Sequence, residues 1–181
     1  GRFDPLADRK HDARVAARLK EEYPRMRIGL VGSHVAVLPD ESLRAAPAAD
    51  FAAREEFDYT VLEIAQGRPL SEVDGISYRE NGSVRHNRDR ALIEDMDALP
   101  DVLDVYKRDL TLENYAIGYL KHPYVSLYTG RGCPARCTFC LWPQTVGGHV
   151  YRTRSPRRVL EDMAKAKSLF PRAKEFFFDD D

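Results

Sequence analysis

The sequence lacks several features that would place a chain of 181 residues in a common class at once. It has no apolar run near the roughly 18 residues of a membrane-spanning helix, so we expect no transmembrane segment. It has no excess of charge of either sign, because 28 Lys and Arg residues oppose 29 Asp and Glu residues. This balance gives no electrostatic reason to expect nucleic acid or an anionic membrane as the main partner. Cysteine is scarce, and three cysteines in one cluster argue against a disulfide framework and favour a reduced, cytoplasmic setting.

What the sequence does contain is a compact cysteine motif. The spacing is Cys133-x3-Cys137-x2-Cys140, and the aromatic residue Phe139 stands directly before the last cysteine. Cysteine thiolates are the usual ligands of iron–sulfur clusters, so three of them can hold three irons of a [4Fe–4S] cube. The fourth iron then has no protein ligand and is open to a substrate or a cofactor. The motif therefore predicts cluster chemistry, with Cys133, Cys137 and Cys140 as metal ligands.

Two other interpretations of the cysteine motif stay open. The three cysteines together with His149 would make a Cys3His zinc site, which is typical of a non-enzymatic interaction module. Three buried and inert thiols are the second alternative, which Arg136 and Thr138 disfavour because they make the loop polar.

The first half of the chain alternates helix and strand signals. Helical spacing of apolar residues runs over 8–23, and a buried strand follows at 27–31. Proline and acidic residues at 39–43 indicate a helix start, 50–53 reads as a short strand, and 58–66 as a helix closed by glycine. This alternation predicts a parallel α/β sheet.

The middle of the chain carries a hairpin signal and then a charged connection. Asn81-Gly82, a strong two-residue turn signal, lies between strand-like residues at 76–79 and Val84. The charged stretch 85–122 is expected to connect two domains and to contain a helix near 112–120.

A second α/β pattern begins at Tyr124. Residues 124–129 read as a strand that the cysteine loop follows directly, and Ser155-Pro156 is a helix start with serine as N-cap. Residues 175–178 read as the next strand. This order predicts the first unit and a half of a (β/α) barrel, in which the chemistry lies where the strands end.

Several polar residues outside the cysteine motif are weaker candidates. His34 follows a strand but, as a lone histidine, is interpreted as a structural polar residue. Glu55 and Glu56 are adjacent and do not face each other, so we interpret them as solvated. Trp142 and Tyr128 are expected to pack near the cysteine loop.

Four arginines crowd the start of the helix that follows the cysteine loop. Cations at a helix N-terminus oppose its dipole, which leaves two interpretations open: an anionic partner or a solvated basic face. The four are Arg152, Arg154, Arg157 and Arg158.

The cysteine spacing resembles that of the radical S-adenosylmethionine (SAM) enzymes. The resemblance implies that SAM binds the open iron, that the reduced cluster cleaves it, and that a 5′-deoxyadenosyl radical abstracts hydrogen from the substrate. It implies cofactor contacts for Phe139, against the adenine, and for Asp179 and Asp180, toward the SAM amino group. An ordinary acidic turn is the alternative for the two aspartates. An electron donor such as flavodoxin or ferredoxin is the implied partner.

The whole chain resembles the radical SAM enzymes that carry an N-terminal, Rossmann-like cobalamin-binding domain. Cobalamin is thus a possible cofactor, although the cobalt-ligating motif D-x-H-x-x-G is absent from the chain, and 53–56 departs from the family's usual Gly-Glu-Gly-Glu. The resemblance implies a partial cobalamin-binding-type domain at 1–84, a connection at 85–122 and the start of a radical SAM (β/α) partial TIM barrel at 123–181. The matching stretches are 29–34, 39–41, 50–62, 74–79 and 95–100.

A finer resemblance concerns the substrate. Residues 128–133 and 141–148 resemble the radical SAM proteins of hopanoid biosynthesis, which are associated with the cyclitol ether head group of bacteriohopanetetrol. This implies an enzyme that acts on a hopanoid side chain or a similar lipid-linked polyol. The enzymatic alternative is a cobalamin-dependent radical SAM methyltransferase.

Both ends of the chain look cut. It opens at Gly1 without methionine, and it closes on an apolar strand that has only reached the acidic residues 179–181. We expect an internal fragment of a longer enzyme, catalytically incomplete by itself.

Overall fold

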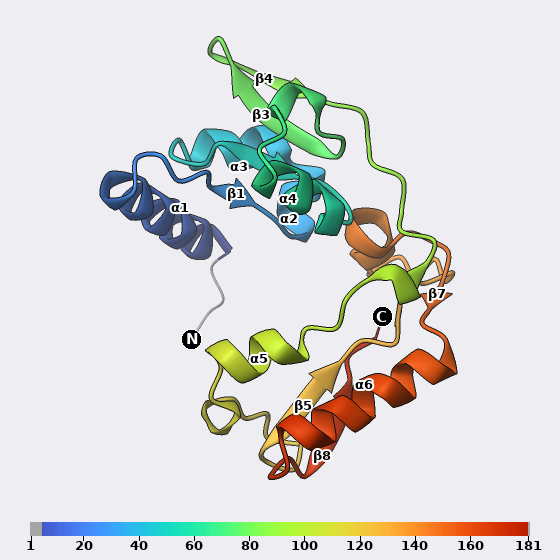
Figure 1. The fold of residues 1–181 in the computed structure, drawn as a ribbon. Helices are drawn as coiled ribbons and strands as arrows, with labels where there is room; N and C mark the ends of the chain where they lie inside the picture. Colours follow the sequence, from blue (N-terminus) through green and yellow to red (C-terminus); the bar gives the residue numbers. More distant parts are fainter. Residues whose placement is uncertain (1–4, 181) are drawn as a thin grey trace. The chain divides into compact units, whose positions relative to one another are not determined.

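The computed structural model describes the backbone of residues 5–180 and the side chains of residues 11–180. Gly1 and Asp181, on which the expectation of an internal fragment rests, lie outside the described residues. The described chain divides into two compact units, coloured by sequence in Figure 1: residues 5–92 with 135–148, and residues 93–134 with 149–180. The domain boundaries expected at 84 and 122 stay a prediction, since a compact unit is not by itself a domain.

A four-stranded mixed sheet forms the centre of the first unit (Figure 1). Its strands, in spatial order, are β1 (Gly29–Leu30), β2 (Phe51–Ala53), β3 (Ile76–Glu80) and β4 (Ser83–His86). β1 and β2 are parallel, whereas β2, β3 and β4 pair antiparallel. The parallel pairing expected for the alternating part of the chain is confirmed for β1 and β2, and β3 joins them antiparallel. The predicted hairpin is confirmed as well: Asn81 and Gly82 both have positive φ, and a two-residue turn joins only antiparallel strands.

Helices flank this sheet largely where the sequence predicts them. Pro39 occupies the first turn of its helix, with Asp40 and Glu41 behind it, as expected for the positive end of a helix dipole. The helical elements of the first unit are α1 (Pro5–Glu22), α2 (Ser33–Val37), α3 (Pro39–Ala45), α4 (Asp58–Ala65), the 3-10 turn η1 (Leu70–Glu72) and the π-helix η4 (Pro143–Gly147).

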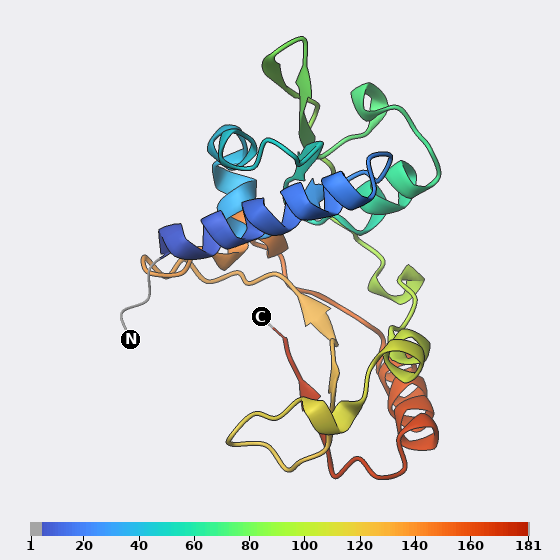
Figure 2. The same ribbon diagram turned by 90° about the vertical axis from the view of Figure 1, so that its left-hand side faces the viewer.

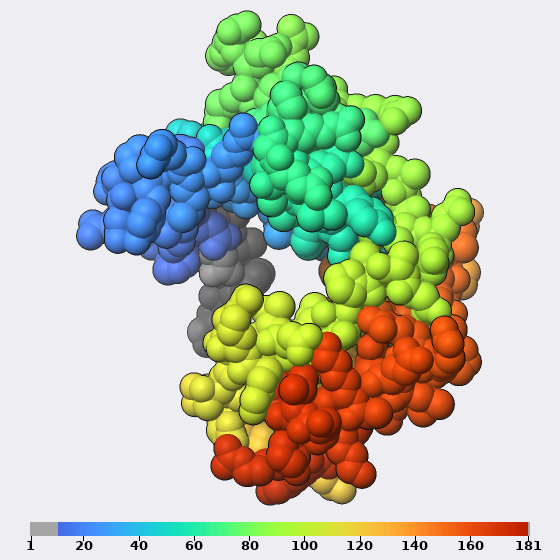
Figure 3. Space-filling model, viewed as in Figure 1, coloured from blue at the N-terminus to red at the C-terminus, as the bar shows by residue number. Residues whose placement is uncertain are grey.

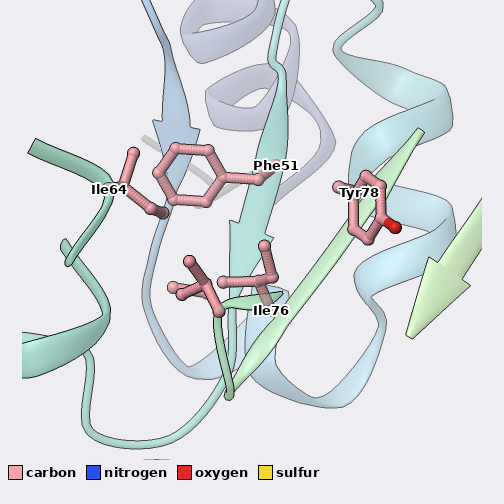
Figure 4. Close-up of a cluster of buried hydrophobic side chains, with 6 residues drawn as sticks. Phe51, Ile64, Ile76 and Tyr78 are labelled. Carbon is pink, nitrogen blue, oxygen red and sulfur yellow. The ribbon is translucent and has the colours of Figure 1, made fainter. Parts of the chain in front are cut away.

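The central strand β2 is buried on both faces, which explains its continuous apolar sequence. Side chains alternate along a strand, so Phe51 packs with Ile64 and Ile76 in one cluster, and Ala52 packs with Leu43 in another. Figure 4 shows Phe51, Ile64 and Ile76 pointing toward one another. The Phe51 ring lies where a Cβ of Gly29 would be, so only glycine fits at that position of β1.

The second unit contains the two strands and the helix of the predicted strand–loop–helix–strand order, whereas residues 135–148 of the loop belong to the first unit. β5 (Tyr124–Leu127) pairs parallel with β8 (Glu175–Phe178), and α6 (Pro156–Leu169) connects them on the way back (Figure 2). Val125 and Leu127 of β5 are buried with Ala166 of α6. The predicted N-cap is confirmed, because the Ser155 hydroxyl accepts a hydrogen bond from the Arg158 N–H at 3.2 Å.

One expected helix of the second unit is wrong. Residues 112–120 contain only the 3-10 turn η3 (Leu112–Asn114), and the α-helix of this region is α5 (Leu103–Asp109). Gly118, together with Asn114, Tyr115 and Tyr119, lowers the helix propensity of the expected helix. In α5, by contrast, Asp104 in the first turn and Lys107 and Arg108 in the last turn favour the helix dipole. Figure 3 shows side chains of α5 and α6 in contact. The remaining elements are η2 (Met96–Ala98), β6 (Gly130–Arg131) and β7 (Arg152–Thr153).

Within residues 5–180, no helix is both long and apolar enough to cross a lipid bilayer.

Candidate functional site

The segment that leads into the cysteine loop is held firmly in the second unit. β6 pairs antiparallel with β7, so that Gly130 faces Thr153, and the Arg154 N–H donates to the Thr129 carbonyl at 2.8 Å. A Cβ at Gly130 would lie 2.7 Å from the Tyr151 hydroxyl oxygen, so the tyrosine ring covers this glycine closely. The loop therefore starts from a fixed backbone.

Asp180, a predicted SAM contact, fixes the same segment from the end of β8. Its carboxylate accepts hydrogen bonds from the Thr129 N–H at 2.6 Å, from the Gly130 N–H at 3.1 Å and from the Thr129 hydroxyl. The carboxylate thus ties the end of β5 to the end of β8. This role needs no ligand, and the SAM contact stays a prediction. Sequence reasoning missed the partnership because the two segments are about fifty positions apart.

Asp179 and Phe139, the other predicted SAM contacts, differ from Asp180 because their side chains are exposed. The Asp179 N–H continues the β5–β8 ladder by donating to the Leu127 carbonyl at 2.9 Å, and its side chain is exposed. Burial, and then the negative charge of Asp179, raise the pKa of Tyr106. The Phe139 ring is 89% exposed. Both residues are accessible to a ligand, and their SAM contacts stay predictions.

The three cysteines are free thiols on a stretch, residues 132–141, that forms neither helix nor strand. Cys137 is exposed, Cys133 and Cys140 are half-buried, and the Cys140 N–H donates to the Cys137 carbonyl at 3.2 Å in a tight turn. Three accessible thiols that form no disulfide suit a cluster by the chemistry of the donor set.

Within residues 5–180, no three His, Cys, Asp or Glu side chains are grouped so that they would hold a metal ion. A binding site assembled by the metal itself is common, because ligands seldom converge before the metal is bound. The assignment of the cysteines as cluster ligands, and the zinc alternative with His149, therefore remain predictions from the spacing.

The cysteine loop is followed by a π-helix, and this helix was not predicted from the sequence. η4 begins directly after Trp142, and the Thr145 hydroxyl donates to the Leu141 carbonyl at 2.9 Å. η4 packs against α2 within the first unit. Short π-helical turns occur frequently at functional sites.

The arginine cluster before α6 serves the fold, so both interpretations offered for it are wrong for its buried members. Arg154 and Asp162 form an ion pair at 2.8 Å, and their side chains are only 8% and 9% exposed. Arg154 also donates to the Leu99 carbonyl at 3.1 Å, and Arg152 donates to the Ile93 carbonyl at 2.7 Å.

The last two arginines differ from each other. Arg158 lies 3.5 Å from Asp162 and 3.7 Å from Asp101, so it too is balanced by carboxylates. Only Arg157, whose side chain is 87% exposed, fits the expected solvated basic face.

The interpretation of Glu55 and Glu56 as solvated is also wrong. Glu56 is 2% exposed and Glu55 is half-buried. Sequence reasoning missed their burial because they follow β2, which is itself buried on both faces.

A serine, a histidine and an aspartate line up in the first unit without forming a nucleophilic site. Ser77 Oγ lies 2.8 Å from His86 Nδ1, and His86 Nε2 lies 3.5 Å from Asp40. Ser77 is completely buried and accepts a hydrogen bond from Arg54 at 2.7 Å. A substrate cannot reach its hydroxyl, so these residues support the β3–β4 pairing. His34, in the first turn of α2, is exposed.

The chain is similar to known proteins both in sequence and in fold. No protein-family model matches the chain. An uncharacterized methyltransferase of Pyrococcus horikoshii is 32% identical over 162 residues, which cover 84% of this chain and 32% of that protein. The chain therefore spans about a third of the length of the curated relative that it matches.

Solved structures of similar fold are radical SAM enzymes that use cobalamin. The radical SAM methyltransferase TsrM of Kitasatospora setae, with tryptophan substrate and a SAM analogue bound, matches 95% of this chain and 33% of its own at a TM-score of 0.66 and 13% identity. TsrM has also been solved with cobalamin and a [4Fe–4S] cluster bound. The cobalamin-dependent radical SAM enzyme OxsB, with aqua-cobalamin and SAM bound, matches 92% of this chain and 22% of its own at a TM-score of 0.62 and 21% identity. At these identities the likeness concerns the fold, and it confirms the predicted mixed α/β class.

Proposed function

We propose that the chain is part of a cobalamin-dependent radical SAM methyltransferase. The observation that carries the proposal is the set of three free thiols, spaced C-x3-C-x2-C, directly after β5 and β6 in a fold similar to TsrM and OxsB. Cys133, Cys137 and Cys140 would hold three irons of a [4Fe–4S] cluster. The cluster, when bound, would supply an open iron for SAM and one electron for its cleavage.

The residues around the motif would prepare the loop and receive the cofactor. Asp180 holds the Thr129–Gly130 backbone and so fixes where the loop starts. Phe139 offers an exposed aromatic face for the adenine, and Asp179 offers an exposed carboxylate for the SAM ammonium group. An electron donor of the flavodoxin or ferredoxin kind would meet the exposed loop.

Methyl transfer is the reaction that the comparisons support best. The Pyrococcus relative and TsrM both carry the description methyltransferase, and TsrM and OxsB have both been solved with cobalamin. The hopanoid head-group reaction rests on the loop resemblance at 128–133 and 141–148 and remains the second candidate. Product analysis separates them: methyl transfer predicts a methylated product with S-adenosylhomocysteine, and the hopanoid reaction predicts a rearranged, unmethylated polyol.

Anaerobic reconstitution with iron and sulfide tests the class of site. The proposal expects about four irons and four sulfides per chain. The variant Thr138→Ala, in the same loop but without a ligand, should bind as much. Zinc bound in place of iron would instead indicate the Cys3His interaction module.

A further inference from the structure

We propose that a cavity of the first unit, beside Glu55, is a subsite for a group that donates N–H hydrogen bonds, such as a primary carboxamide or an ammonium. The cavity measures about 290 Å³ and lies among α2, η4 and the segment after β2. Small-molecule pockets commonly measure about 300–1,000 Å³, so this space suits one arm of a ligand rather than a whole one. The lining residues that matter here are Val37, Arg54, Glu55, Asp89, Gln144 and Thr145.

The backbone at Glu55 is strained in a way that presents this residue at the cavity. Its φ is +53°, in the left-handed region. Glycine adopts this region readily and Asn and Asp do so occasionally, but glutamate seldom does. Both neighbours are held in place, because the Arg54 guanidinium donates several hydrogen bonds to the fold and Glu56 is only 2% exposed. Strain of this kind persists where surrounding contacts enforce it, and it gathers at ligand sites.

Arg54, although it lines the cavity, has little hydrogen-bonding capacity left for a ligand. Its guanidinium donates to the carbonyls of Ile76 and Asn87, each at 2.6 Å, and to Ser77 Oγ and Asp89 Oδ1, each at 2.7 Å. Its side chain is 11% exposed. The positive charge is therefore directed into the fold. Among the other lining side chains, the Gln144 amide still offers N–H donors, whereas Glu55 and Asp89 present negative charge to any anionic ligand.

The remaining groups of the cavity are mainly acceptors. Glu55 contributes a carboxylate, and Asp89 a second one that is largely exposed. Thr145 uses its hydroxyl proton for the Leu141 carbonyl, which leaves its oxygen lone pairs for an incoming donor. Val37 supplies an apolar wall for the stem of such a group.

The pKa of Glu55 also favours an N–H donor as the group that occupies the cavity. Burial raises the pKa of the Glu55 carboxyl, Asp89 raises it further, and Arg54 only partly offsets both. Partial burial and the nearby Asp89 thus disfavour the ionised form of this carboxylate. An N–H donor in the cavity would restore part of the lost solvation.

Among ligands with such groups, a corrinoid fits best, because its periphery carries several primary carboxamide arms. This choice of source rests on the proposed cobalamin dependence. The cavity would then hold one arm, with Glu55 as the acceptor, and Glu55 would be a positioning residue for the cofactor rather than a ligand of its metal.

Titration with hydroxocobalamin, followed by quenching of Trp142, the single tryptophan, tests the subsite. Glu55→Gly removes both the acceptor and the strain. We expect it to bind about tenfold more weakly, since a charged acceptor is lost, and to raise the melting temperature by about 2–4 °C. Asn81→Gly relieves the other positive φ of a non-glycine residue, in the β3–β4 turn, and should leave binding unchanged. Equal affinity of the Glu55→Gly variant and the wild type would overturn the proposal.

Failure of hydroxocobalamin to bind would count against the proposed cofactor. A second titration then tests the cavity by itself, with small molecules. The probes are propionamide, propylammonium and propionate, observed through the side-chain amide resonances of Gln144. We expect the two N–H donors to shift these resonances and propionate to leave them unmoved, and the shifts to vanish in Glu55→Gly. Glu55→Gln, which keeps the size but not the charge, should lose mainly the propylammonium shift. No response to either donor, or a response to propionate, would overturn the subsite.

Discussion

The arginine segment 152–158 and the cysteine loop 132–141 follow each other closely in the sequence, yet the fold treats them in opposite ways. Arg154 is buried and paired with Asp162, and its second nitrogen donates to main-chain carbonyls. The three cysteines form no disulfide within the described residues; Cys137 is exposed, and Cys133 and Cys140 are half-buried. Charged groups that the fold has already neutralised are poor candidates for ligand binding, whereas accessible donors without an internal role are good ones. The difference separates residues that maintain the structure from residues that await a cofactor.

The largest expected effect concerns the cysteines. Replacing Cys133, Cys137 or Cys140 by alanine should abolish cluster assembly and SAM cleavage, because each thiolate holds one iron. Far-ultraviolet circular dichroism should stay unchanged, since the loop contains no helix or strand. Thr138→Ala is the matched control and should assemble the cluster normally. A cysteine variant with full SAM cleavage would refute the assignment.

The arginine side of the comparison is tested by Arg154→Ala. Removing Arg154 leaves Asp162 with only the longer, 3.5 Å contact to Arg158, so the free energy of unfolding should fall by about 3 kcal/mol, the low end for a broken buried pair. Urea unfolding measures this change. Arg157→Ala, at an exposed position in the first turn of α6, should change stability by no more than about 0.5 kcal/mol. Equal effects of the two variants would mean that the burial of Arg154 carries no energetic weight.

Asp180 sharpens the comparison, because its carboxylate holds the backbone before the cysteine loop and is also a predicted SAM contact. Asp180→Asn keeps one oxygen that can accept from the two backbone N–H groups, but it removes the negative charge and the second acceptor, which the Thr129 hydroxyl uses; the change should cost about 1–3 kcal/mol. Hydrogen exchange at Thr129 and Gly130 should accelerate. Asp179→Asn is the control. Because the Asp179 side chain is exposed, this variant should change neither the free energy of unfolding nor the hydrogen exchange at Thr129 and Gly130.

The smallest expected effect is a pH dependence at Asp101. Burial by itself raises the pKa of this carboxyl, but hydrogen bonds from Lys165 and from the Leu103 N–H, with the charges of Lys165 and Arg158, outweigh it and lower the pKa. The carboxylate therefore adds stability above the unfolded-state pKa of about 3.9, and this stability is lost as pH falls through the lower folded-state value.

Urea unfolding across the acid range checks the sign. The wild type should lose stability below about pH 4 more steeply than Asp101→Asn, which lacks the titrating group. Parallel curves for the two proteins would contradict the lowered pKa.

The sequence predicts those parts of the fold that depend on neighbouring residues. Asn81-Gly82 makes a hairpin, and Ser155 caps α6, because each signal and its consequence lie within a few positions. The cysteine motif belongs to the same kind, since its spacing is local. Contacts over long separations could not be predicted this way. Thr129 meets Asp180, and Arg154 meets Leu99, only once β5, β8 and α6 have packed.

The strained residue Glu55 shows the same limit from another direction. Nothing in its local sequence marks a left-handed conformation, which glycine or asparagine would indicate. The conformation follows from Arg54 and Glu56, which tertiary contacts hold on either side. For the candidate site, therefore, the sequence predicts which atoms bind iron, and the structure adds which residues support the loop.

The central claim is that the three free cysteines hold a [4Fe–4S] cluster whose fourth iron is open to SAM. Electron paramagnetic resonance of the anaerobically reconstituted and reduced protein, recorded with and without SAM, tests it most directly. We expect a reduced [4Fe–4S] signal that changes when SAM is added. A cluster signal that SAM leaves unaltered, or a protein that retains zinc and no iron, would contradict it.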